Sequence, residues 1–151
     1  MKQTTALVVL AFVVSLIASC APTQSLTQPP SQPEPLRQPP RQSSLTEAAF
    51  TVSPGNYVFY KFSAAEGSRV TGRFRASGGS RNDIGVLILD GDQFENWKNR
   101  HSTPTYYNSE KVTVGSIDVT LRAGTYYLIF DNKFSVLSNK AITADIKLTQ
   151  P

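Results

Sequence analysis

The sequence contains a single cysteine, Cys20, among its 151 residues. One cysteine cannot form a disulfide within the chain, and it cannot supply the several thiolate ligands of a structural zinc or iron–sulfur site. The folded part of the chain must therefore be held together by buried apolar side chains and by hydrogen bonds.

Residues with catalytic chemistry are also scarce. The chain has one histidine, His101, and it contains neither a Gly-x-Ser-x-Gly nucleophile elbow nor a glycine-rich phosphate loop. Four acids, Asp83, Asp90, Asp92 and Glu95, lie close together in the sequence, but they flank expected turns, where solvated carboxylates are common. The sequence therefore predicts no enzyme activity and no cofactor.

The segment Asp90-Gly91-Asp92 matches the beginning of a calcium loop. An EF-hand loop that began at Asp90 would need an oxygen ligand at position 94 and a glycine at position 95. The chain has Phe94 and Glu95 at these positions. The sequence therefore predicts no metal site, although it leaves calcium binding open.

The excess of basic residues is small. Lysine and arginine outnumber aspartate and glutamate by 15 to 11. Three of these bases (Lys2, Arg37 and Arg41) and one acid (Glu34) precede residue 45, so the positive and negative charges of residues 45–151 nearly balance. A nucleic-acid-binding domain usually carries a basic stripe and a recognisable reading element. We therefore expect no nucleic-acid partner.

Residues 1–19 have the organisation of an export signal. Lys2 supplies a basic start, residues 6–17 are almost entirely apolar, and the small residues Ala18 and Ser19 follow. This apolar run is shorter than the roughly 20 residues that a membrane-spanning helix needs. The sequence thus predicts a cleaved signal peptide over residues 1–19.

The segment Ile17-Ala18-Ser19-Cys20 resembles the lipobox of bacterial lipoproteins. This resemblance implies that Cys20 carries diacylglycerol, becomes the new N-terminus and anchors the chain to a lipid bilayer. Ala21 follows the cysteine in place of the aspartate that favours inner-membrane retention in enteric bacteria. The resemblance therefore favours the outer membrane, in a host that has one.

Residues 20–44 are expected to form a disordered tether. Between residues 22 and 44 the chain has seven prolines among Gln, Ser and Thr, and no apolar periodicity. Proline-rich chains favour the extended polyproline II conformation. We expect a spacer that leads from Cys20 to one domain over residues 45–151.

That domain has an all-β signature. From Phe50 onward, short runs of Val, Ile, Thr, Tyr and Phe alternate with Gly, Pro, Asn and Asp, and no helical periodicity lasts a dozen positions. Seven or eight short strands in about a hundred residues predict an antiparallel β-sandwich or jelly roll. The expected strands cover residues 48–53, 56–63, 68–76, 84–89, 125–130 and 141–148, and residues 110–121 form either one strand or a bent pair with a break at Gly115-Ser116.

Two sets of residues are candidates for binding. Arg69, Arg73 and Arg75 alternate along one strand, so they share one face and form either a solvated surface or an anion-binding stripe. The long segment 91–109 concentrates aromatic residues, which form either a platform for a partner or a cap over one end of the sandwich. The aromatic candidates are Phe94, Trp97, Tyr106 and Tyr107, and the spacing of Phe94 and Trp97 would suit one helical turn.

Residues 124–135, Gly-Thr-Tyr-Tyr-Leu-Ile-Phe-Asp-Asn-Lys-Phe-Ser, followed by Lys140 and a last strand, resemble the end of GOLD (Golgi dynamics) domains. Residues 123–128 also resemble part of bacterial pre-peptidase C-terminal domains. Both families are β-sandwiches, and GOLD domains are noncatalytic protein-interaction modules. The chain lacks the cysteine pair, coiled coil and C-terminal membrane helix of GOLD-containing cargo receptors, so their role in cargo transport is not implied.

The same segment also has a purely structural interpretation. Gly124 would occupy a turn with positive φ, Tyr126, Leu128 and Phe130 would share an inward face, and Asp131-Asn132 would cap a turn. A ligand role for the Asp-Asn pair is the alternative.

Taken together, these observations predict a noncatalytic lipoprotein whose β-sandwich binds a protein partner in the cell envelope. The alternatives are a glycan-binding or cell-wall-binding module and a purely structural envelope protein.

Overall fold

The computed structural model describes residues 39–79 and 81–151. The chain divides into two units, Met1–Pro35 and Leu36–Pro151, and the described residues belong to the second. The predicted signal peptide, Cys20 and most of the predicted tether lie outside the described residues.

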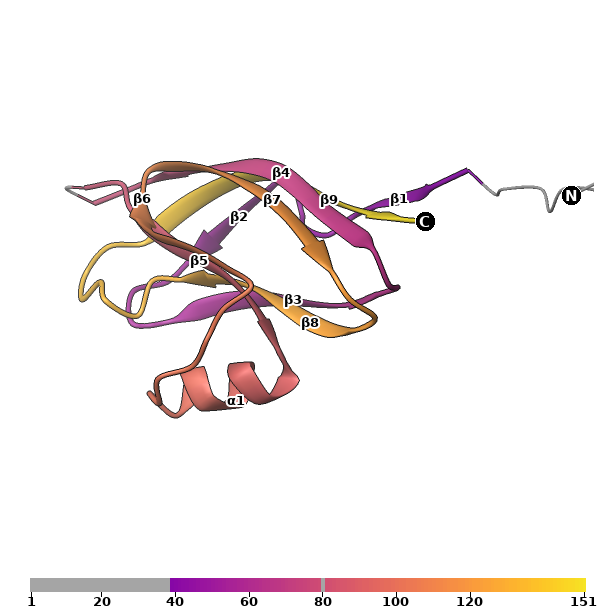
Figure 1. Ribbon diagram of the computed structural model, residues 1–151. Helices are drawn as coiled ribbons and strands as arrows, with labels where there is room; N and C mark the ends of the chain where they lie inside the picture. The colour runs from indigo at the N-terminus through magenta and orange to yellow at the C-terminus, as the bar shows by residue number, and fades with distance from the viewer. Residues whose placement is uncertain (1–38, 80) are drawn as a thin grey trace, which may run out of the picture. The chain divides into compact units, whose positions relative to one another are not determined.

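Nine strands in the described residues form two antiparallel sheets (Figure 1). The first sheet has the order β1-β9-β4-β7, and β2 also pairs with β9, while the second has the order β3-β8-β5-β6. The predicted all-β sandwich is therefore confirmed, with more strands than expected. The strands are β1 (Arg41–Ser44), β2 (Ala49–Val52), β3 (Tyr57–Ala64), β4 (Ser68–Ser77), β5 (Ile84–Asp90), β6 (Tyr107–Val112), β7 (Val114–Leu121), β8 (Gly124–Asp131) and β9 (Lys140–Gln150).

The first strand begins before the predicted domain boundary. Arg41 to Ser44, which were expected to belong to the tether, pair with Lys147 to Gln150 of β9. β2 then pairs with residues 140–143 of the same strand. β1 and β2 therefore form one interrupted edge along β9.

The predicted break at Gly115-Ser116 is wrong. The chain leaves β6 and enters β7 at Thr113, and Gly115 lies inside β7 opposite Phe74. A Cβ at Gly115 would overlap the Phe74 ring. This glycine therefore makes room for a core aromatic side chain and does not interrupt a strand.

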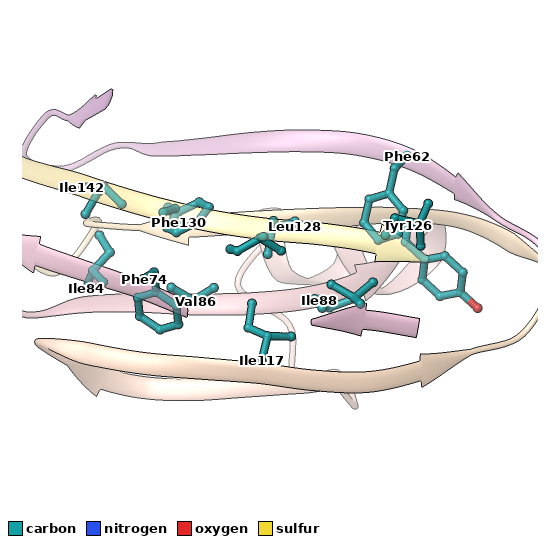
Figure 2. Packing of buried hydrophobic residues seen from close by; sticks show 14 of the residues in the cluster. Phe62, Phe74, Ile84, Val86, Ile88, Ile117, Tyr126, Leu128, Phe130 and Ile142 are labelled. Atoms are coloured by element: carbon teal, nitrogen blue, oxygen red, sulfur yellow. The ribbon is translucent and has the colours of Figure 1, made fainter. Parts of the chain in front are cut away.

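The main core lies between the two sheets and follows the predicted alternation (Figure 2). Val70 and Phe74 of β4 face inward, whereas Arg69, Arg73 and Arg75 point outward. Burial of each large apolar side chain contributes about 1.5–3 kcal/mol. Besides Phe74, Figure 2 labels the core residues Phe62, Ile84, Val86, Ile88, Ile117, Tyr126, Leu128, Phe130 and Ile142.

A second, smaller core covers the outer face of the second sheet. The helix α1 (Gly91–Lys98) lies against this face, on the side away from the first sheet (Figure 1). β5 is therefore buried on both sides, as its continuous apolar sequence predicts. We call this second core the outer cluster; it consists of Leu87, Leu89, Phe94 and Ile129, with Tyr57, Trp97 and Tyr127 packed against them.

The helix replaces part of the irregular segment expected over residues 91–109. Asp90 accepts a hydrogen bond from the Gln93 amide at 2.9 Å, and the Gln93 side chain accepts one from the Asp90 amide at 3.1 Å. This capping box satisfies exposed donors at the helix start. Phe94 and Trp97 then both pack into the outer cluster, as their spacing predicts.

The Asp-Asn segment at the end of β8 has structural roles. Asp131 caps a turn by accepting a hydrogen bond from the Lys133 amide at 2.8 Å. Asn132 is fully buried, and its Nδ2 donates to the carbonyl oxygens of Val52, Ser53 and Ser138 at 3.0–3.2 Å. One side chain thus joins β8, the end of β2 and the loop before β9.

Gly124 does not have the predicted positive φ. It is the first residue of β8, and a Cβ there would lie 3.3 Å from the Tyr126 ring. Packing against Tyr126, and not turn geometry, therefore explains the small residue at this position.

Candidate functional site

A pocket of about 360 Å³ opens beside α1, and we call it the Trp97 pocket. The outer side of β5, the bulged strand β6, the end of β8 and the loop after α1 all contribute to it. Its lining combines the rings of Trp97, Phe134 and His101 with hydroxyl, amide, carboxylate and ammonium groups. The lining residues are Gly85, Leu87, Trp97, His101, Ser102, Thr103, Thr105, Asn108, Glu110, Lys111, Asp131 and Phe134.

An irregularity in β6 shapes one wall of this pocket. The β5–β6 register shifts between Gly85 and Leu87, and Glu110 has a φ of 56°. The Asn108 side chain accepts a hydrogen bond from the Glu110 amide at 2.8 Å, and this bond stabilises the unusual conformation. The bulge brings both polar side chains to the pocket.

Trp97 is held in place by three neighbours. Its ring stacks on Phe94 at a centroid distance of 6.1 Å and meets Tyr57 edge-on at 5.0 Å. The Lys133 ammonium lies 3.6 Å from the Trp97 ring centroid, a favourable cation–π arrangement. The aromatic wall of the pocket is therefore formed before any ligand arrives.

Asp131 is the most buried carboxyl group of the Trp97 pocket. Burial raises the pKa of Asp131 above its ordinary value, while the Lys133 amide and the charges of Lys133 and Lys111 act in the opposite direction. The net shift is upward because desolvation of the carboxylate is the largest effect.

The four predicted aromatic residues do not form a single platform. Trp97 lines the pocket, but Phe94 is buried beneath it and stacks on Tyr127 at 4.3 Å. Tyr106 packs edge-on against Tyr126 at 5.1 Å. Tyr107 packs against the main core, and its hydroxyl donates a hydrogen bond to the Ser116 carbonyl at 2.9 Å.

Aromatic residues on the outer face of β3 were missed. Tyr57 and Phe59 belong to the same aromatic cluster as Phe94, and Phe59 remains 46% exposed. Successive side chains of a strand point to opposite faces, so in the predicted strand over residues 56–63 Tyr57 and Phe59 share the face opposite Phe62. That alternation was the available signal.

The three predicted arginines lie together on the outer face of β4. Arg69 makes two hydrogen bonds of 2.6 Å to the carboxylate of Asp118. Arg73 is paired in register with Asp145 of β9. Because carboxylates are interleaved with the guanidinium groups, this arrangement favours the solvated-face interpretation over an anion stripe.

The clustered acids have separate structural partners. Asp83, which was expected to be a solvated turn residue, pairs with the buried Lys140 at 3.0 Å. Burial acts to raise the pKa of Asp83, but the hydrogen bond from Lys140 and the charges of Lys140 and Arg81 outweigh it and lower the pKa. Asp90 caps α1, and Glu95 pairs with Lys98 at 3.0 Å.

The described residues contain neither a metal cluster nor a membrane-spanning helix. Within residues 39–79 and 81–151, no three His, Cys, Asp or Glu side chains are close enough together to hold a metal ion. In the same ranges, no helix has the length and apolar character needed to cross a bilayer.

Comparison with known proteins places the chain in no family. No family model matches it, and no curated protein matches its sequence. Eighteen chains of solved structures match. One, described as "CBM4 structure and function", has 12% sequence identity and a TM-score of 0.45, and the match covers 70% of this chain and 77% of that one. A similarity this low does not indicate a ligand.

Proposed function

We propose that this protein is a noncatalytic binding module that holds a saccharide of the cell envelope in the Trp97 pocket. The observation that carries the proposal is the preformed pocket itself, in which a fixed tryptophan lies beside hydrogen-bonding side chains of both polarities. A sugar ring has apolar C–H surfaces surrounded by hydroxyl groups. An aromatic wall together with polar side chains complements both features.

The polar groups of the pocket can both donate and accept hydrogen bonds. Glu110 and Asp131 offer carboxyl oxygens, and Asn108 offers an amide. The Thr103 hydroxyl is buried and has no hydrogen-bond partner in the described part of the chain. A ligand hydroxyl could supply that partner, and the volume of about 360 Å³ falls within the usual range of ligand sites.

Anchoring at Cys20 is the second part of the proposal, and it rests on the lipobox resemblance. We expect the mature wild-type protein, expressed in a lipoprotein-competent bacterium, to begin at Cys20 and to carry the mass of its acyl chains. Cys20→Ala should lose that mass and the association with membranes. Mass spectrometry of both proteins makes the comparison, and a wild-type product that is cleaved without lipid would refute the anchor.

Ligand binding can be followed through Trp97 because it is the only tryptophan of the chain. We expect soluble envelope polysaccharides to shift its fluorescence. Thr103→Val should weaken binding about tenfold, because the variant leaves a ligand hydroxyl without its partner. Thr120→Val is the matched control, since this exposed residue of β7 does not line the pocket.

Three results would contradict the saccharide proposal. The first is an unchanged Trp97 emission with every polysaccharide tested, and the second is equal binding by Thr103→Val and Thr120→Val. The third is release of reducing ends during incubation, which would make Glu110 and Asp131 candidates for catalysis and contradict the noncatalytic part.

A protein-interaction module is the second candidate function, and one surface favours it. Exposed Phe59 lies beside the Tyr127 ring at 5.8 Å. Lys61 and Lys98 lie over neighbouring rings at 5.8 Å and 5.3 Å. If no polysaccharide binds, and if Phe59→Ser abolishes cross-linking to one envelope protein, this second function replaces the first.

A further inference from the structure

A second pocket of about 270 Å³ adjoins the Trp97 pocket and has a different chemical character. Three cationic side chains line it, those of Arg81, Lys111 and Lys140, together with a single carboxylate, that of Asp83. We call it the cationic pocket. Its lining thus carries two more positive charges than negative ones.

The Lys140 side chain is held in place within the cationic pocket. It is only 4% exposed, and its ammonium donates hydrogen bonds of 3.0 Å to the Gly78 carbonyl and the Asp83 carboxylate. An ammonium group has three donors, so one N–H remains beyond these two bonds. A buried charge with a free donor at a pocket is preorganised to receive an anionic oxygen.

The other two cations lie near carboxylates, since the charge of Arg81 acts on Asp83 and that of Lys111 acts on Asp131. In the described ranges, neither Arg81 nor Lys111 forms an ion pair with a carboxylate. Lys111 lies 4.4 Å from the ring centroid of Phe134, which positions its ammonium without cancelling its charge. Arg81 presents a planar guanidinium, which can hold a carboxylate or phosphate through two parallel hydrogen bonds.

The two pockets share part of their lining. Lys111 and Phe134 line both of them, so they stand at the boundary between the aromatic and the cationic part. A ligand that fills the Trp97 pocket with a sugar ring would therefore extend past Phe134 toward Arg81 and Lys140.

We propose that the cationic pocket binds an anionic substituent, a carboxylate or a phosphate ester, of the saccharide held in the Trp97 pocket. This inference rests on the proposed function and narrows its ligand class to acidic polysaccharides. Both substituents share negatively charged oxygens that match the three cations. The lining of the pocket thus favours a negatively charged substituent. Titration with a carboxylate polymer and with a phosphodiester polymer distinguishes the two candidate groups.

The test titrates the full chain with three polymers and follows Trp97 fluorescence. They are a uronic-acid polysaccharide, its carboxyl-reduced derivative and a phosphodiester-linked polysaccharide. We expect at least one acidic polymer to bind about tenfold more tightly than the reduced one at low salt. Rising salt should remove this preference. The acidic polymer that shows it identifies the substituent.

Arg81→Gln should abolish the preference for the acidic polymer and leave binding of the carboxyl-reduced polymer unchanged. Arg81 lines the cationic pocket and not the Trp97 pocket, so the aromatic part of the site stays intact. Arg75→Gln is the control, because it removes the same charge from the outer face of β4. An equal preference in both variants would overturn the inference and leave the proposed function standing.

A separate measurement distinguishes failure of the saccharide proposal from failure of the anion inference. If no polymer binds, acetate and inorganic phosphate are titrated while the backbone amide resonances of Gly78 and Gly79 are followed. Shifts that disappear in Arg81→Gln would support the anion pocket and refute the saccharide. Unchanged resonances would refute both.

Discussion

Asn132→Ala is expected to lower the free energy of unfolding by about 2–3 kcal/mol. The Asn132 side chain is fully buried and donates to three main-chain carbonyl oxygens, from Val52, Ser53 and Ser138. The Ser53 and Ser138 oxygens also accept from the Asn56 amide and the Ser135 hydroxyl, so the main cost, about 1–3 kcal/mol, is loss of the buried hydrogen bond to Val52. The small cavity left by the amide adds to this cost. Urea unfolding followed by Trp97 fluorescence measures the change.

Asn56→Ala is the matched control for this prediction. Asn56 donates one hydrogen bond of 3.2 Å to the Pro54 carbonyl in an exposed turn, so its loss should change stability by less than about 1 kcal/mol. If Asn132→Ala were as stable as the control, the buried amide would not hold the three segments together.

The same position also predicts a pH dependence. Asn132→Asp keeps the shape of the side chain but places a carboxyl group beside three carbonyl oxygens, where only the protonated form can donate. The folded-state pKa of the new group should therefore lie above its unfolded value of about 3.9. The variant should be most stable below that value and lose stability as the pH rises through the folded pKa.

Gly72→Ala is expected to cost more than about 3 kcal/mol or to prevent folding altogether. Gly72 lies in β4, between β7 and β9, and a Cβ there would overlap the Asp145 carbonyl oxygen and the Ile146 Cα. Both are main-chain atoms, so no side-chain rotation relieves the contact. Relief would require β4 and β9 to separate at the centre of the first sheet.

Gly91→Ala provides the control for this steric argument. Gly91 is the first residue of α1, and a Cβ there would meet no atom within 4 Å. Alanine is also the better helix former, so stability should stay equal or rise slightly. Circular dichroism and thermal unfolding compare the two variants, and equal midpoints would contradict the predicted clash.

Alternation along the strands allowed most of the sandwich to be predicted. In β4 the sequence correctly placed the three arginines on one face, and the structure has Val70 and Phe74 on the other, because a half-buried strand has a period of two. The four residues of β1 are Arg-Gln-Ser-Ser and carry no apolar signal. They form a strand because they pair with β9, and no local sequence pattern predicts that pairing.

The helix and the candidate site were harder to anticipate for a related reason. α1 has eight residues and buries only Phe94, so it is too short for a helical period to emerge, although the Asp90–Gln93 capping box was readable. The pocket residues Thr103, Asn108 and Phe134 come from separate segments. Each alone resembles an ordinary surface residue, and only the fold brings them together.

The interrupted edge formed by β1 and β2 has a mechanical consequence. β1 is exposed along its whole length and contains no apolar residue, whereas Val52 of β2 is fully buried in the main core. If the chain is anchored at Cys20, a pull on it would peel β1 from β9 before the core is disturbed. Four residues released at about 3.4 Å each would lengthen the connection by about 14 Å. Reversible release of β1 would then relieve the pulling force before the rest of the sandwich unfolds.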